Sequence, residues 1–175
     1  MNLTLRPYKP SDATVITSWL KNEYLMRQWC ADRYDYYPIT PEAMNAYHEK
    51  FIDRDKSCAL TMCDGDEILG YITLRTPADD HAEQRLGFVI VDDSKRGQGL
   101  GKSLVSLAVD YALRELGAAK VSLGVFENNS YAIHCYEAAG FHRISRHDIE
   151  SYQCMGETWN CIEMILLKDK MIYDT

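Results

Sequence analysis

The fold of this chain is constrained most by the run from Val89 to Lys102. A β-branched segment there leads into a basic turn with three alternating glycines, and an apolar pattern at helical spacing follows. Glycines let backbone N–H groups approach an anion closely, and a helix N-terminus adds partial positive charge. The order of strand, glycine-rich turn and helix therefore predicts an α/β fold that holds a phosphorylated ligand at this turn.

The spacing of the glycines narrows the class of ligand. A Walker A loop needs a glycine where Arg96 stands, and the dinucleotide fingerprint G-x-G-x-x-G needs one where Lys102 stands. The pattern that fits is Arg/Gln-x-x-Gly-x-Gly/Ala, which is met by Arg96, Gly99 and Gly101. This pattern resembles the acetyl-CoA pyrophosphate loop of the GNAT superfamily of N-acetyltransferases.

A second motif follows the predicted strand at 121–126. It resembles the other GNAT signature, Asn-x-x-Ala-x-x-x-Tyr-x-x-x-Gly-Phe, and is matched at Asn129, Ala132, Tyr136, Gly140 and Phe141. Asn129 can cap a helix, while Ala132 and Tyr136 fall one turn apart on one helix face. A small residue at 132 lets a thin pantetheine arm pass, and Tyr136 would point its hydroxyl into the same channel.

Together the two matches imply a fold. They span roughly residues 84–142, which would be the cofactor-binding half of one N-acetyltransferase domain over residues 1–175. The expected fold is the GNAT fold, with a mixed, mostly antiparallel sheet that is splayed at the cofactor site and flanked by helices. Hydrophobic periodicity agrees with that order. It predicts strands at 2–7, 58–63, 68–74, 85–91, 120–126, from 140 onward and at 158–167, and helices at 11–22, 41–52, 98–116 and 129–139.

The resemblance also implies a reaction, in which a primary amine attacks the thioester of acetyl-CoA directly within a ternary complex. Acetyl-CoA would be a co-substrate, and no metal is expected. Tyr136 would protonate the leaving thiolate, since a free thiol has a pKa of about 8.5. Glu83 is a candidate base that would take the proton from the amine. Two alternatives stay open: Glu83 is only a solvated carboxylate at a strand end, or a water chain replaces a protein base. The residues expected at the cofactor are Val89, Ile90, Val91, Arg96, Gly97, Gln98, Gly99, Leu100, Gly101, Lys102, Asn129, Ala132 and Tyr136, and backbone N–H groups around Val89 and Val91 would meet the oxyanion.

Two other hypotheses about the function are weighed against an active acetyltransferase. A CoA-binding sensor that has lost catalysis would keep the same fold, although the presence of Asn129 and Tyr136 favours an enzyme. A kinase or nucleotide hydrolase is disfavoured by the failed Walker spacing. The aromatic residues between 24 and 47 either line an acceptor cleft or pack as an ordinary connection; they are Tyr24, Trp29, Tyr34, Tyr36, Tyr37 and Tyr47.

Charge and composition limit which partners and which cellular compartment are expected. A formal net charge of −7 disfavours nucleic-acid binding and favours a cationic acceptor, here a small-molecule or peptide amine. No apolar run is long enough to cross a bilayer, and the N-terminus lacks the apolar core of a signal peptide. Six cysteines without a C-x-x-C pair are typical of reduced thiols, so a cytoplasmic location is expected. A homodimer is left open.

Overall fold

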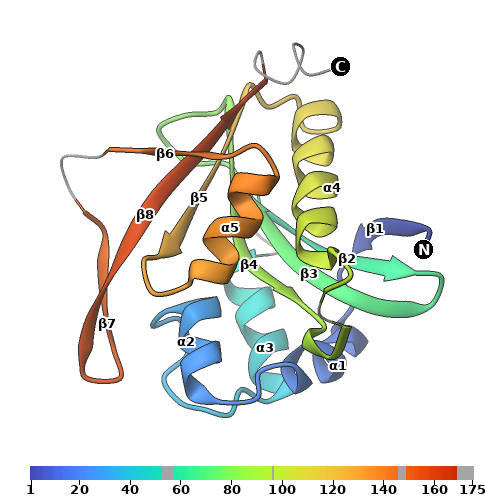
Figure 1. The fold of residues 1–175 in the computed structure, drawn as a ribbon. Helices are drawn as coiled ribbons and strands as arrows, with labels where there is room; N and C mark the ends of the chain where they lie inside the picture. Colours follow the sequence, from blue (N-terminus) through green and yellow to red (C-terminus); the bar gives the residue numbers. More distant parts are fainter. Residues whose placement is uncertain (53–56, 96, 146–148, 169–175) are drawn as a thin grey trace.

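The computed structural model describes residues 1–52, 57–95, 97–145 and 149–168. Within these residues eight strands form one mixed sheet, shown in Figure 1. The strands are β1 (Leu3–Pro7), β2 (Ser57–Asp64), β3 (Glu67–Arg75), β4 (Glu83–Val91), β5 (Lys120–Phe126), β6 (His142–Ile144), β7 (Ser151–Cys154) and β8 (Glu157–Leu167).

The strand order is β1-β2-β3-β4-β5-β8-β6, with β7 paired to the far end of β8. All of these pairings are antiparallel except the one between β4 and β5, which is parallel. The sheet is therefore mixed and mostly antiparallel, as the sequence predicts.

The helices are α1 (Ala13–Ser18), α2 (Glu23–Cys30), α3 (Pro41–Tyr47), α4 (Leu100–Arg114) and α5 (Ser130–Ala138). A 3-10 turn precedes α1 at Pro10–Asp12, another spans Asp93–Lys95, and a π-helical turn continues α3 over His48–Ile52. The start of α3 follows the sequence signal, because the Thr40 hydroxyl accepts a hydrogen bond from the N–H of Ala43 at 3.1 Å. None of the described helices is long and apolar enough to cross a bilayer.

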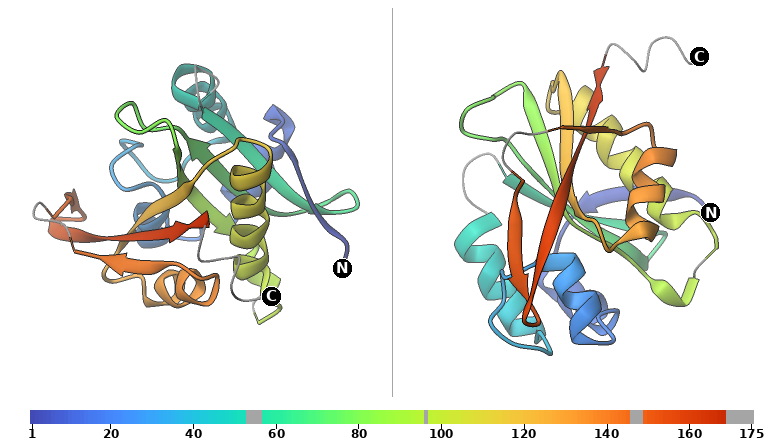
Figure 2. Two further views of the ribbon diagram at one scale, coloured as in Figure 1. Left: turned by 90° about the horizontal axis from the view of Figure 1, so that it is seen from above. Right: turned by 60° about the vertical axis from the view of Figure 1, so that its left-hand side comes forward.

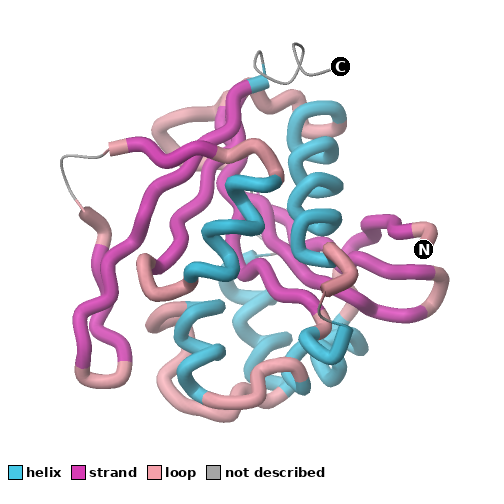
Figure 3. Tube along the Cα trace, viewed as in Figure 1, coloured by secondary structure: helices cyan, strands magenta, loops and turns pink. Residues whose placement is uncertain are grey.

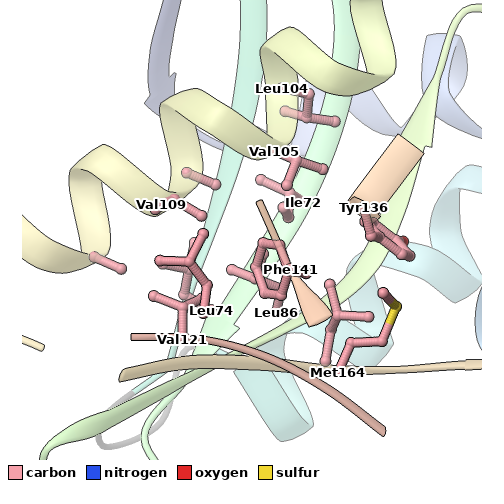
Figure 4. Packing of buried hydrophobic residues seen from close by; sticks show 14 of the residues in the cluster. Ile72, Leu74, Leu86, Leu104, Val105, Val109, Val121, Tyr136, Phe141 and Met164 are labelled. Atoms are coloured by element: carbon pink, nitrogen blue, oxygen red, sulfur yellow. The ribbon is translucent and has the colours of Figure 1, made fainter. Parts of the chain in front are cut away.

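Helices cover both faces of the sheet (Figures 2 and 3). The buried side chains of α4 and α5 pack against one face, where Leu104, Val105 and Val109 meet Ile72, Leu86 and other apolar residues of the strands (Figure 4). Helices α1 to α3 pack on the other face around Ile16, Met26, Met44 and Tyr71. Two separate hydrophobic clusters thus hold the sheet from opposite sides.

Strands β4 and β5 pair only over their first halves. The register runs from Glu83 opposite Lys120 to Leu86 opposite Leu123, and from there the two strands run apart (Figure 1). A bulge lies in the half of β4 that does not pair with β5. There the register to β3 shifts, and Phe88 has a φ of 49°. The sheet is therefore splayed next to the glycine-rich turn.

Two elements differ from the sequence-based expectation in the N-terminal half. The helix predicted over 11–22 ends at Ser18, because Asn22 caps a new helix and accepts a hydrogen bond from the N–H of Leu25 at 2.9 Å. That helix, α2, falls in the segment for which no regular structure is predicted.

The C-terminal half holds one further strand that the sequence does not predict. Strand β7 turns into β8 through Met155 and Gly156, both at positive φ. Hairpin turns of this kind usually carry Asn-Gly or Asp-Gly. Because methionine takes the first position of this turn, the usual Asn-Gly or Asp-Gly pattern does not predict it.

Candidate active site

A cavity of about 550 Å³ lies where β4 and β5 separate. On the face of the sheet covered by α4 and α5, its lining includes Gly101, Ala132 and Tyr136. On the opposite face, it includes Trp29 of α2 and Glu150 before β7. The cavity thus reaches through the gap in the sheet and has two halves, one on each face.

The N-terminus of α4 borders the first half. Gly99 caps this helix at a φ of +72°, and nothing lies within 4 Å of the Cβ that another residue would carry there. Helical hydrogen bonding begins with the N–H of Ser103, which donates to the carbonyl of Gly99 at 3.0 Å. The N–H groups of Leu100, Gly101 and Lys102 precede it and have no acceptor within the helix. Such a set of N–H groups at the positive end of a helix suits a phosphate.

The residues predicted at the cofactor divide into three groups. Those that line the cavity are Val89, Ile90, Val91, Gly101, Asn129, Ala132 and Tyr136. Those at the start of α4 but outside the cavity lining are Gly97, Gln98, Gly99, Leu100 and Lys102. The Leu100 side chain is buried in the core, so only its backbone faces the proposed phosphate position. Arg96 lies outside the described residues.

Helices α4 and α5 approach each other closely beside the cavity. A Cβ on Gly101 would come within 3.1 Å of the Cys135 sulfur. Asn129 caps α5, and its side-chain oxygen accepts a hydrogen bond from the N–H of Ala132 at 3.2 Å. Gly101 therefore lets α4 and α5 pack closely, and the small side chain of Ala132 lines the cavity beside them.

Tyr136 lies at the inner wall of the same half. It is only 7% exposed and packs near Phe141, with 6.2 Å between the ring centroids. Burial raises the pKa of the Tyr136 phenol above its ordinary value, so the hydroxyl keeps its proton at neutral pH. A protonated phenol that lines the cavity has the chemistry of a proton donor.

The bulge in β4 forms the middle of the cavity. Gly87 pairs with Thr73 and Ile90 with Tyr71, so Phe88 and Val89 together stand opposite Ile72. A bulge of this kind leaves a residue out of the ladder. One residue of this stretch is thus left out of the ladder beside the gap, where the family resemblance predicts an oxyanion site.

The structure does not bring Glu83 to the cavity. Glu83 lies at the paired end of β4, where the Ser122 hydroxyl donates to its carboxylate and Lys120 Nζ is 2.6 Å away. The carboxylate that the structure places in the second half is Glu150, which the sequence reasoning missed. Its Oε2 is 3.9 Å from an Arg85 nitrogen. No local motif surrounds Glu150, and only the tertiary fold brings it to the site.

Arg85 organises the floor of the second half. Its guanidinium donates to both carboxylate oxygens of the buried Glu163, at 3.0 Å to Oε2, and to the Ser122 hydroxyl at 3.2 Å. A Cβ on Gly124 would lie 2.9 Å from an Arg85 nitrogen, so this glycine makes the space that the guanidinium fills. The sequence indicates the face toward which the Arg85 side chain points, because strict alternation puts Arg85 and the buried Leu86 on opposite faces of β4.

Side chains of α2 and of the segment that follows it contact the β7–β8 hairpin beside the second half. The Tyr24 and Trp159 rings meet edge to face at 5.2 Å, and the Arg33 guanidinium lies 5.6 Å from the centre of the Tyr152 ring. Burial and a hydrogen bond to Glu150 raise the pKa of Tyr152 to about 12. Of the six aromatic residues singled out between 24 and 47, Trp29 lines the cavity, whereas Tyr34, Tyr37 and Tyr47 pack in the cluster under α1 to α3.

Comparison with known proteins places this geometry among acetyltransferases. The family model for the acetyltransferase (GNAT) family matches residues 19–141. A spermidine N(1)-acetyltransferase from Vibrio cholerae is 25% identical over 97% of this chain and 95% of its own length. A mycothiol acetyltransferase from Geodermatophilus obscurus is 38% identical, but the match covers only 46% of this chain and 27% of that protein. The crystal structure of the Vibrio spermidine enzyme with CoA and spermine superposes with a TM-score of 0.79 at 23% identity, over 97% of this chain and 98% of that one.

Proposed function

The chain belongs to the acetyltransferase (GNAT) family, and from that premise we propose that a primary amine attacks acetyl-CoA directly while both are bound. The expected GNAT fold is confirmed, and the protein is an acetyl-CoA-dependent N-acetyltransferase. One observation carries the proposal of direct attack. The cavity passes through the gap between β4 and β5, with the α4 N-terminus on one side and Glu150 on the other.

Two substrates fit this arrangement without displacing each other. The diphosphate of CoA would bind the N–H groups of Leu100, Gly101 and Lys102, and Lys102 would add charge at the rim. The pantetheine arm would run past Ala132 toward the bulge of β4. An amine that enters from the face of α2 and β7 would reach the same point from the opposite side. Holding both reactants in line converts a bimolecular step into an effectively unimolecular one.

Three groups of the protein would then act on the reacting atoms. Bound acetyl-CoA supplies an activated thioester. Backbone N–H groups of the β4 bulge would stabilise the charge that develops on the carbonyl oxygen. Glu150 would hold the ammonium form of the acceptor and take up its proton, directly or through water. Tyr136 would protonate the departing sulfur.

Release of free thiol from acetyl-CoA tests the activity, measured across a panel of primary amines. We expect turnover that requires the amine and gives an N-acetylated product in equal amount to the thiol. Initial rates with both substrates varied should give intersecting rather than parallel double-reciprocal lines, as simultaneous binding requires. Parallel lines with an isolable acetyl-enzyme would contradict direct attack. Tight CoA binding without turnover of any amine would instead favour the non-catalytic sensor.

Replacing Tyr136 with phenylalanine should lower kcat by about 10²-fold, the usual range for a positioned general acid. The dissociation constant of CoA should change little, because the ring and its packing stay. Tyr111, a half-buried tyrosine on α4 outside the cavity lining, provides the matched control, and its phenylalanine variant should keep the wild-type rate. Equal kcat values for Tyr136→Phe and wild type would remove this hydroxyl from the reaction.

A further inference from the structure

The second half of the cavity is lined by more basic than acidic side chains. Its charged lining residues are Arg33, Arg75 and Arg85 on the positive side and Glu150 on the negative side. Asp93, the other acidic residue of the lining, belongs to the 3-10 turn that precedes α4. Three arginines in one half of a cavity are unexpected in a chain with a net charge of −7. An arginine of this lining whose charge no carboxylate offsets would suit a negative group on the acceptor.

Two of the three arginines already have partners in the protein. Arg85 is paired with Glu163 and lies near Glu150. Arg33 is 2.8 Å from Asp32 and contacts the Tyr152 hydroxyl at 3.5 Å. Arg75 differs from both, because no carboxylate among the described residues lies within ion-pair distance of its guanidinium. It is exposed at the end of β3 and lines the cavity.

Arg75 occupies an electrostatically unfavourable position in the free protein. Arg75 stands directly opposite Arg85 in the antiparallel register of β3 and β4. Like charges directly opposite each other on neighbouring strands destabilise a sheet. Arg85 is held by Glu163, so the repulsion falls on Arg75, which has no carboxylate partner in the described part of the chain. An anion bound between Arg75 and the cavity would relieve it, and an arginine fork matches the geometry of a carboxylate.

We propose that the acceptor is a primary amine that also bears a carboxylate, as a free amino acid does. Arg75 binds the carboxylate, and Glu150, on the other side of Arg85, receives the amine. The inference rests on the proposed N-acetyltransferase function and names the substrate class of the same site. A polyamine has only positive charges, so it gains at Glu150 but is repelled by Arg75, whose charge no carboxylate among the described residues offsets. The site therefore favours a different acceptor from the polyamine named for the Vibrio relative.

Two matched series of acceptors test this proposal. L-Phenylalanine, L-phenylalaninamide and phenethylamine share one side chain and differ in the carboxylate, and L-lysine, L-lysinamide and cadaverine repeat the comparison with a second amine. Spermidine is the polyamine probe. In thiol-release assays we expect kcat/KM for the carboxylate in at least one series to exceed that of its amide and its decarboxylated form by about tenfold or more. One charge-assisted hydrogen bond accounts for a ratio of this size.

The variant Arg75→Gln should remove that preference. Its KM for the carboxylate acceptor should rise about tenfold, while kcat, the rates with the amide and the affinity for CoA stay close to those of the wild type. Arg114→Gln is the matched control, because Arg114 is a highly exposed arginine on α4 outside the cavity lining, and it should change none of these values. A purely structural role for Arg75 would lower the rates with all acceptors alike.

The outcomes separate this inference from the proposed function. Turnover of spermidine, or of amides and carboxylates at equal efficiency, would overturn the carboxylate proposal and leave the acetyltransferase intact. Equal loss of activity toward every acceptor in Arg75→Gln would also overturn it. Tight CoA binding without turnover of any of the seven amines would overturn both proposals together.

Discussion

Replacing Gly99 with valine should weaken CoA binding by about a hundredfold or more. Gly99 has a φ of +72° and starts α4. A β-branched residue at positive φ is strongly disfavoured, so the turn has to move to relieve the strain. The N–H groups of Leu100, Gly101 and Lys102 would then no longer converge on one point, and the valine side chain would project into the open space that the diphosphate needs. Calorimetric titration with CoA measures the change directly.

Gly117 provides an unusually close control for that experiment. It has a φ of +69°, and an added Cβ there also meets nothing within 4 Å. It lies beyond the opposite end of α4, away from the cavity lining. Gly117→Val should therefore show the same backbone strain as Gly99→Val, seen as a lower Tm, but keep the affinity for CoA. Equal affinities for CoA in the two variants would rule out the α4 N-terminus as the phosphate site.

Removing the Arg85 guanidinium should lower the free energy of unfolding by about 3–5 kcal/mol. Arg85→Met would remove the guanidinium that donates to both oxygens of the Glu163 carboxylate, whose side chain is 7% exposed. A buried charge that loses its partner is much more costly than the same pair replaced by apolar side chains. The double variant Arg85→Met with Glu163→Leu should thus recover most of the loss. Urea denaturation of the two single variants and the double variant measures the coupling between the residues.

The exposed pair of Arg143 and Glu137 supplies the comparison. Its atoms approach to 3.0 Å, but the two side chains are 54% and 44% exposed. Removing Arg143 should change the free energy of unfolding by about 1 kcal/mol or less, since water screens an exposed pair. Similar effects at Arg85 and Arg143 would show that Arg85 and Glu163 are better solvated than their burial indicates.

The cofactor half of the site could be predicted because local sequence determines it. A positive φ at Gly99, a helix cap at Asn129 and the spacing of Ala132 and Tyr136 are all set within a few residues of chain. These patterns predicted α4, α5 and β5 within two residues at each end. The roles of these residues in binding and catalysis stay predictions.

The acceptor half could not be predicted in the same way, because segments far apart in the sequence build it. Glu83 illustrates the difficulty. Alternation correctly places it on the same face as Arg85, but the sequence does not say where β4 and β5 part. They part after Leu86, and a strand rises about 3.3 Å per residue. Glu83 therefore lies about 13 Å before Gly87, on the closed side. Glu150 enters the cavity only because β7 folds back along β8.

The gap between β4 and β5 has a consequence for the order of events in a catalytic cycle. A cleft on one surface would force two substrates to share an entrance, and the second to bind would block the first. Here the coenzyme and the amine would use separate entrances on opposite faces of the sheet, so either product can depart while the other remains. A single molecule that joins both substrates would have to thread between two strands of the sheet, and it could leave only after one end had been drawn back through the opening.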